Sequence, residues 1–411
     1  MPRQLFFKRP MQMNPERPRL DRLADYPPVL RGGFRPFFLG GALWALTVLV
    51  LWIGALAGSW SLATSFDPLA WHRHEMLFGY LAAVIAGFLL TAIPNWTGRL
   101  PVTGGRLAAL AILWLAARVA VLFSAVVGPW TAFALDVGFL LVLFVVAARE
   151  VIAAKSRNFP IVIIILLFAT ANAFDHAEAM GFAVSEGIGW RAGLALVLAL
   201  IALIGGRIIP SFTSNWLAKQ GRTTGLPAQP NRFDKLSLAS LAVALIGWVA
   251  VPDGAVTAVL LLFAGVMQAL RLARWSGYRT VRDPLVLVLH VSFAWLPLGL
   301  LLLGWSIYDP SIARTSALHA LTAGAMASMT LAVMTRATLG HTGRELRADG
   351  LTSAIYLLVT LGAALRVGAM LLPFDYMRAI ELSGLMWGGA FLLFVIAYGP
   401  KLIGGRPDGR P

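Results

Sequence analysis

The chain has 411 residues, of which 58% are hydrophobic and only 13% charged, and its formal net charge is +15. Soluble domains are roughly half apolar and a quarter charged, so this composition predicts an integral membrane protein of the all-α class. The basic residues lie between apolar runs rather than on one soluble face, which argues for a lipid bilayer and against nucleic acid as the partner. Cysteine is absent, which excludes disulfides, thiolate-bound metals, iron–sulfur clusters and covalently attached haem.

A basic arm, about twelve apolar runs and a short tail make up the predicted chain. Residues 1–35 are basic and contain prolines, and they lack the apolar core and small-residue cleavage site of a signal peptide. The predicted transmembrane helices are 36–60, 71–94, 107–127, 131–154, 160–180, 189–210, 236–251, 255–272, 284–308, 315–335, 353–372 and 377–403. Residues 404–411 follow as a tail.

The loop at residues 211–235 divides the predicted transmembrane domain, 36–403, into the halves 36–210 and 236–403. Its glycine, proline and charge content is typical of an exposed linker. Basic residues are concentrated in alternate loops. One side carries Arg99, Arg106, Arg149, Lys155, Arg157, Lys219, Arg222, Arg232, Lys235, Arg271, Arg274, Arg279, Arg282, Arg344, Arg347, Lys401, Arg406 and Arg410, whereas the other carries Arg73, Arg191, Arg314 and Arg378. This asymmetry predicts cytoplasmic N- and C-termini.

Two segments of the chain match each other without a gap. "HEMLFGYLAAVIAGFLLTAIPNWTGR" begins at His74, and "HALTAGAMASMTLAVMTRATLGHTGR" begins at His319, at a constant offset (319 − 74 = 245). The histidine, the glycine five residues later and the final Thr-Gly-Arg coincide, which predicts an internal pseudo-repeat. A third, interrupted copy joins "HAEAMG" at His176 to "GGRIIPSFTSN", whose Pro210 matches Pro94.

Four of the six histidines are predicted at one membrane depth. His72 and His74 begin the second run, His319 begins the tenth and His176 ends the fifth, all within about two helical turns of the outer boundary. His290 lies deeper in the ninth run. A single intramembrane histidine usually forms a hydrogen bond between helices, which contributes about 1 kcal/mol or less. Several at one depth favour a metal or haem site.

Haem is expected between His74 and His319, because the repeat places them equivalently. Small residues after each would let a macrocycle approach the backbone, although they equally permit tight helix packing. Arg118 and Arg366 lie inside apolar runs, where a guanidinium needs an anion or a carbonyl as partner. A haem propionate and a carboxylate such as Asp136 both remain open as that partner.

Copper is expected at a separate site. The two histidines of "WHRH" are two residues apart and diverge by about 200° on an ideal helix, so they should serve different groups. His72 shares a helix face with Met76, and imidazole with thioether suits copper(I). We expect His72 and His176 as ligands, completed by Met76 or a carboxylate such as Glu178, with His290 as a candidate third imidazole. The alternative is that His72 only sits in the headgroup layer.

The stretches "WHRHEM", "RPFFLGG", "GGRIIPSFTSN" and "HALTAGAMASMTLAVMTRATLGHTGR" together resemble the NnrS family of bacterial membrane proteins. The likeness runs from about residue 34 to 403. It implies a twelve-helix protein of the bacterial cytoplasmic membrane that holds haem, expected to be b-type, and copper. It also implies a role in nitric oxide metabolism, in denitrification or protection against nitrosative stress.

A more distant resemblance is to the catalytic subunits of haem–copper oxidases, whose haem histidines also lie on helices two and ten. The second half of this chain lacks the adjacent histidine pair of their copper centre, so oxygen reduction is not implied. Three functions stay open. The first is binding or turnover of nitric oxide, in which case an enzyme would be a haem–copper oxidoreductase. The second is a secondary transporter, and the third is a non-catalytic assembly or sensor protein.

Overall fold

The computed structural model describes residues 25–371 and 375–409. The predicted N-terminal arm, apart from its last residues, therefore lies outside the described part. The protein is all-helical, with 79% of residues in helices and no strand in the described ranges. Within these two ranges, twelve helices are long and apolar enough to cross a membrane. The all-α, polytopic prediction is confirmed.

The first half of the chain contains η1 (Pro28–Leu30), α2 (Phe34–Leu56), α3 (Pro68–His74), η2 (Glu75–Tyr80), α4 (Leu81–Thr97), α5 (Gly104–Leu122), α6 (Ser124–Val127), α7 (Pro129–Ala153), α8 (Phe159–Ala179) and α9 (Ile188–Lys219). The second half contains α10 (Arg232–Ala250), α11 (Ala255–Ala273), η3 (Gly277–Arg279), α12 (Pro284–Tyr308), α13 (Arg314–His319), η4 (Ala320–Met326), α14 (Ala327–His341), α15 (Gly350–Gly368), η5 (Ala369–Leu371) and α16 (Tyr376–Ile403).

The linker between the halves is shorter than the sequence predicted. Helix α9 continues through Pro210 to Lys219, and α10 begins at Arg232, so the irregular segment is 220–231 rather than 211–235. The start of α10 is fixed by a capping box, in which the Asn231 side chain accepts from the Phe233 backbone N–H and Asp234 accepts from that of Asn231. Polar composition predicted a loop over the whole segment. Backbone hydrogen bonds instead extend α9 at its C-terminal end, and the capping box starts α10 earlier than predicted.

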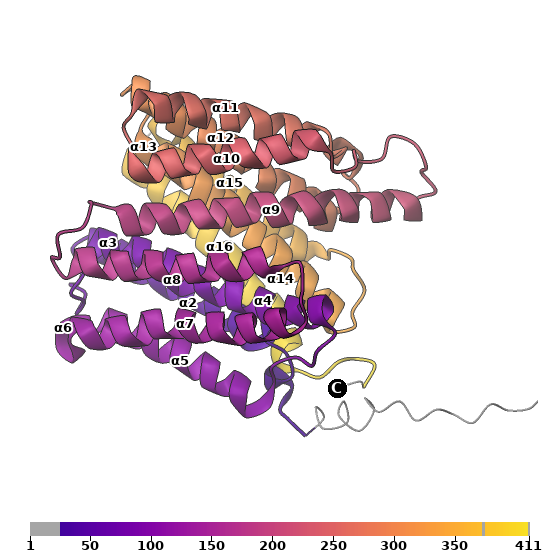
Figure 1. Ribbon diagram of the computed structural model, residues 1–411, viewed down its shortest axis with the longest axis horizontal. Coiled ribbons are helices and arrows are strands. Elements are labelled where there is room, and N and C mark those ends of the chain that lie inside the picture. The colour runs from indigo at the N-terminus through magenta and orange to yellow at the C-terminus, as the bar shows by residue number, and fades with distance from the viewer. Residues whose placement is uncertain (1–24, 372–374, 410–411) are drawn as a thin grey trace, which may run out of the picture.

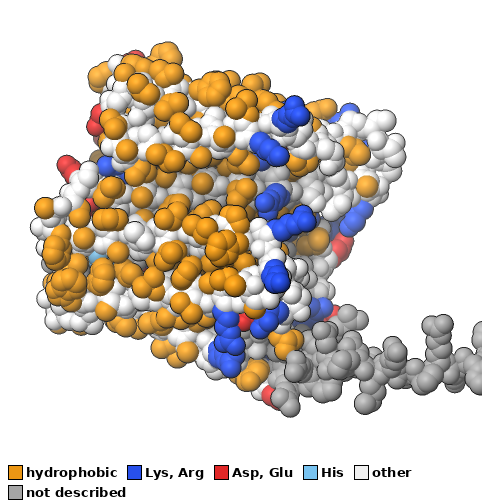
Figure 2. Space-filling view, in the orientation of Figure 1, with side chains coloured by type: hydrophobic (Ala, Val, Ile, Leu, Met, Phe, Trp, Pro, Cys, Tyr) orange, Lys and Arg blue, Asp and Glu red, His pale blue; other side chains and the backbone are white. Residues whose placement is uncertain are grey.

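Helix α9 joins the two halves of the bundle. It packs against α8 on one side and against α10 and α12 on the other, while α16 packs against α15 and α2 (Figure 1). Side chains of Lys and Arg gather at the end of the molecule where the C-terminal segment lies, beside a broad hydrophobic face (Figure 2). Helices α3 and α13 lie at the opposite end. This charge separation agrees with the alternating loop charges of the sequence.

The internal repeat has a structural counterpart. His74 is the last residue of α3 and His319 the last of α13, and each is followed at once by a π-helical segment, η2 or η4, before the helix resumes. Such segments shift the register of a helix and occur frequently at functional sites. The third copy differs, because His176 lies in α8 whereas its matching Pro210 lies in α9. Its histidine is therefore not in an equivalent position.

Candidate metal centre

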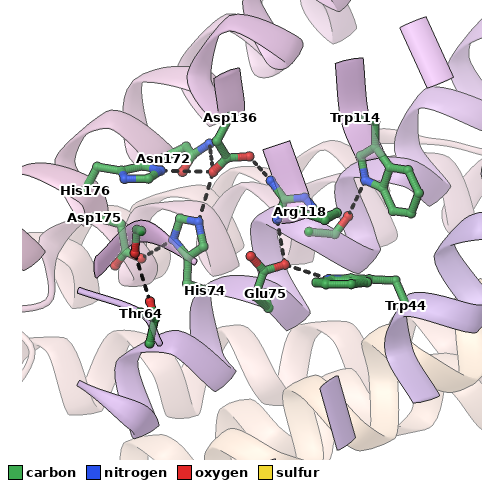
Figure 3. A network of polar contacts seen from close by, with 12 residues as sticks. Trp44, Thr64, His74, Glu75, Trp114, Arg118, Asp136, Asn172, Asp175 and His176 are labelled. Atoms are coloured by element: carbon green, nitrogen blue, oxygen red, sulfur yellow. Dashed lines mark hydrogen bonds and ion pairs between the residues drawn. The ribbon is translucent and has the colours of Figure 1, made fainter. Parts of the chain in front are cut away.

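His74 and His176 lie in a cluster of buried polar side chains drawn from α3, η2, α5, α7 and α8 (Figure 3). Helix α3 presents His74 at its C-terminal end, and its N-terminus is fixed by Asp67, which accepts from the Leu69 and Ala70 backbone N–H groups. We call the following residues the His74 cluster: His74, Glu75, Arg118, Asp136, Asn172, Asp175 and His176.

Three members of the cluster could hold a metal ion. One ligand atom each from His74, Asp136 and His176 lies within 4.8 Å of the others. The Nε2 atoms of His74 and His176 are 2.9 Å and 3.0 Å from Asp136 Oδ2. Two imidazoles and one carboxylate on the same side of a site suit iron, copper or zinc. The donor set therefore fits a metal ion at the point where these three atoms converge.

Asp175 holds the His74 ring from the other side. Its Oδ2 lies 2.8 Å from His74 Nδ1, and it is 3% exposed. Metal-bound histidines usually donate their second N–H to a carboxylate or carbonyl, which fixes the tautomer and the ring orientation. With Nδ1–H donating to Asp175, Nε2 is the nitrogen left for a metal. Each ring nitrogen of His74 thus faces a carboxylate oxygen.

Arg118 links the metal-binding residues to a second carboxylate. This side chain is fully buried, and its guanidinium donates to Glu75 Oε2 at 2.7 Å and pairs with Asp136 Oδ1. Trp44 Nε1 donates to the same Glu75 oxygen at 2.6 Å. Gly79 makes this approach possible, because a Cβ there would lie 2.3 Å from Glu75 Oε2. Arg118 is buried and paired, as a guanidinium in hydrocarbon must be.

Carboxylates are the most numerous charged groups of the cluster. Glu75, Asp136 and Asp175 carry three carboxylates, and Arg118 pairs with the first two of them. Arg73, just outside the cluster, lies within electrostatic range of Asp175 and supplies a second positive charge. A bound metal cation is compatible with this concentration of buried carboxylates.

Aromatic rings surround the two imidazoles. Phe66 lies 4.7 Å from the His74 ring and 5.2 Å from the His176 ring, measured between centroids, and Phe78 lies 5.3 Å from His74. Phe133 covers His176 at 5.7 Å. These rings limit water access, so charges inside the cluster interact in a low-dielectric environment.

His72 and His319, which were expected at different cofactors, belong to one second group with Arg366. The three side chains lie within electrostatic range of one another, and the His72 ring stacks on Trp52 with 4.9 Å between centroids. The structure thus pairs the histidines differently from the sequence-based expectation. His74 lies with His176 rather than His319, and His72 lies with His319 rather than His176.

The remaining predicted ligands lie elsewhere. His290 contacts Thr213 Oγ1 through Nε2 at 2.8 Å, and a Cβ on Gly277 would lie 2.6 Å from its Nδ1, so it belongs to neither histidine group. Met76 is partly buried against the hydrophobic core. Glu178 accepts a hydrogen bond from the Gly187 backbone N–H at 2.8 Å, before the start of α9.

Sequence reasoning missed Asp175, Asn172 and Glu75 as members of the site and treated Asp136 only as a partner for arginine. A signal was present, because an acidic residue inside an apolar run is itself a marker of a functional site. Glu75, Asp136 and Asp175 all meet that criterion.

The fold and this cluster define a polytopic membrane protein with a buried histidine–carboxylate centre suited to a metal ion. Comparison with protein families shows that the chain belongs to the NnrS family, whose NnrS protein model matches residues 28–406. This membership suggests a membrane haem or metal protein related to nitric oxide. No curated protein sequence matches the chain.

Proposed function

We propose that the protein is a metalloprotein of the bacterial cytoplasmic membrane that binds or turns over nitric oxide. The observation that carries the proposal is the convergence of His74, Asp136 and His176 in a buried cluster, within a chain of the NnrS family. Its biological context is denitrification or protection against nitrosative stress. Copper and b-type haem are the cofactors proposed, with copper at the His74 cluster.

Two of the three ligands of the proposed copper site, His74 and Asp136, are held by neighbouring side chains. Asp175 orients the His74 ring, Asn172 Nδ2 donates to Asp136 Oδ2 at 3.0 Å, and Arg118 holds the other Asp136 oxygen. Bound copper would supply an open coordination position to a small ligand such as nitric oxide. The protein's own residues would orient the imidazoles and exclude water.

Metal analysis of the purified full-length protein tests the proposal. We expect about one metal ion per chain at the cluster, and loss of most of it in Asp136→Asn and His176→Ala, because removal of a direct ligand weakens binding by more than the roughly 10–100-fold typical of supporting residues. The matched control is His341→Ala, an exposed histidine near the other end of the bundle. Addition of nitric oxide should change the absorption or electron paramagnetic resonance spectrum of the metal.

Two results would count against the function. Wild-type protein that takes up neither copper nor iron after reconstitution would remove the metal centre. Full metal content in both ligand variants would show that the metal is bound elsewhere.

A further inference from the structure

The second histidine group, formed by His72, His319 and Arg366, differs chemically from the His74 cluster. It brings together His319, the first residue of the second repeat copy, and His72, two residues before the first copy, at the end of the bundle opposite the basic loops (Figure 1, Figure 2). In the described part of the chain, no carboxylate is ion-paired with any of the three side chains. The group therefore presents imidazole nitrogens and a cation without a built-in anion.

His319 has the hydrogen bond that prepares a histidine as an iron ligand. Its Nδ1 lies 2.7 Å from the Thr315 backbone oxygen, one turn earlier, so Nδ1 carries the proton and Nε2 has a lone pair. Among described residues, none is hydrogen-bonded to that Nε2. His74, the repeat-equivalent residue, has both ring nitrogens facing carboxylates. The two equivalent histidines are thus prepared for different partners.

His72 provides a second available nitrogen. Its Nδ1 is buried and has no hydrogen-bond partner, which is rare for a polar atom in a protein interior. Stacking on Trp52, at an interplanar angle of 19°, fixes the plane of its ring. A partly buried imidazole held in place with a buried, unused nitrogen is consistent with a ligand that the protein alone does not supply.

Arg366 supplies the charge that such a ligand must match. It is half-buried near the end of α15, a helix that packs against α13, and it lies within electrostatic range of both imidazoles. A guanidinium within a transmembrane bundle normally faces an anion, as Arg118 does with Glu75 and Asp136. The ligand therefore combines a metal that accepts imidazole with an anionic group.

We propose that this second group is the haem site, with the iron on His319 Nε2, a haem propionate on Arg366 and His72 as the neighbouring imidazole. Haem has both required features, an iron atom and carboxylates carried on an apolar ring. The assignment rests on the proposed function, which includes haem among the cofactors. It places haem at a different site from the metal of the His74 cluster. Neither His74 nor Arg118 touches haem in this arrangement.

Haem binding by purified full-length variants tests the assignment. In His319→Gly, haem content should fall below about a tenth of the wild-type value, and added imidazole should restore the Soret band by replacing the missing ring. Arg366→Gln should bind added hemin several-fold more weakly. His74→Ala, which removes a copper ligand, should retain haem, as should the control His341→Ala.

Copper and haem are counted separately on each sample, so the two proposals can fail independently. Unchanged haem content and spectrum in His319→Gly would overturn the haem assignment, as would loss of haem from His74→Ala alone or absence of hemin uptake by wild-type protein. The copper content of Asp136→Asn and His176→Ala, which tests the His74 cluster, is measured on separate variants and does not depend on these results. If His319→Gly does not fold, hemin affinity in Arg366→Gln decides the assignment, and wild-type affinity there would overturn it.

Discussion

Arg118 neutralises two buried carboxylates, and its removal should destabilise the protein strongly. In Arg118→Met, the volume of the side chain is roughly kept while Glu75 and Asp136 lose the guanidinium that lies 2.7 Å from Glu75 Oε2. Breaking a buried ion pair by removing one partner costs about 3–5 kcal/mol, because the remaining charge is left uncompensated. All three side chains are fully buried, so solvent screening does not reduce this figure.

The free energy of unfolding can be measured by titrating denaturing detergent into mixed micelles and following tryptophan fluorescence. We expect a loss of at least about 3 kcal/mol for Arg118→Met. Glu75→Gln in the same chain should recover part of it, since the amide carries no charge and its oxygen still accepts from Trp44 Nε1. The matched control Arg106→Met, exposed on the same helix, should change stability by less than about 0.5 kcal/mol.

A loss below about 1 kcal/mol for Arg118→Met would refute the reasoning, because it would mean that the carboxylates do not depend on the guanidinium. Absence of recovery in the double variant would show that the uncompensated charge of Glu75 is not the cause of the lost stability.

Three further outcomes are expected. Gly79→Ala should lower both stability and metal content, because its Cβ would lie 2.3 Å from Glu75 Oε2, whereas Gly105→Ala, which has open space around it, should change neither. Metal content at equilibrium should fall as the pH decreases from 8 to 5, because protons compete for the imidazole nitrogens, and a constant content would contradict imidazole ligation. Asp349→Ala should lower the free energy of unfolding by about 1 kcal/mol, because it removes the N-cap of α15. Hydrogen bonds from Thr352 hold the pKa of Asp349 below its usual range. The contribution of this carboxylate to the free energy of unfolding should therefore be present above pH ~4 and lost as the pH falls through its folded pKa.

Most of the fold could be predicted because the bilayer restricts the length and the composition of the helices that cross it. A span needs about 20 apolar residues, so hydropathy locates each helix with little regard to its neighbours. Helix ends were less predictable, since the end of α9 at Lys219 depends on backbone hydrogen bonds that continue into a polar segment. The repeat was predictable because it rests on His74 and His319, a residue type that is rare in this chain.

The grouping of the histidines could not be predicted, for a geometric reason. Rise per residue gives the depth of a side chain in the membrane, but the lateral position depends on how the helices pack. His74 and Asp175 are far apart in the chain and meet only because α3 and α8 lie close together. Depth alone therefore placed four histidines in one layer and left open which of them would share a ligand.

The two copies of the repeat show how one backbone device can support two kinds of site. A histidine followed by a π-helical segment occurs in both copies, so each copy presents an imidazole at the same end of the bundle. In the first copy, α7 brings Asp136 to that imidazole, whereas the residue at the same offset in α16 is Glu381, which is exposed. An imidazole among carboxylates favours a metal cation, and one beside an arginine favours a ligand that carries its own negative charge. The difference in neighbouring charge, rather than in the histidine or its helix, therefore distinguishes the two proposed sites.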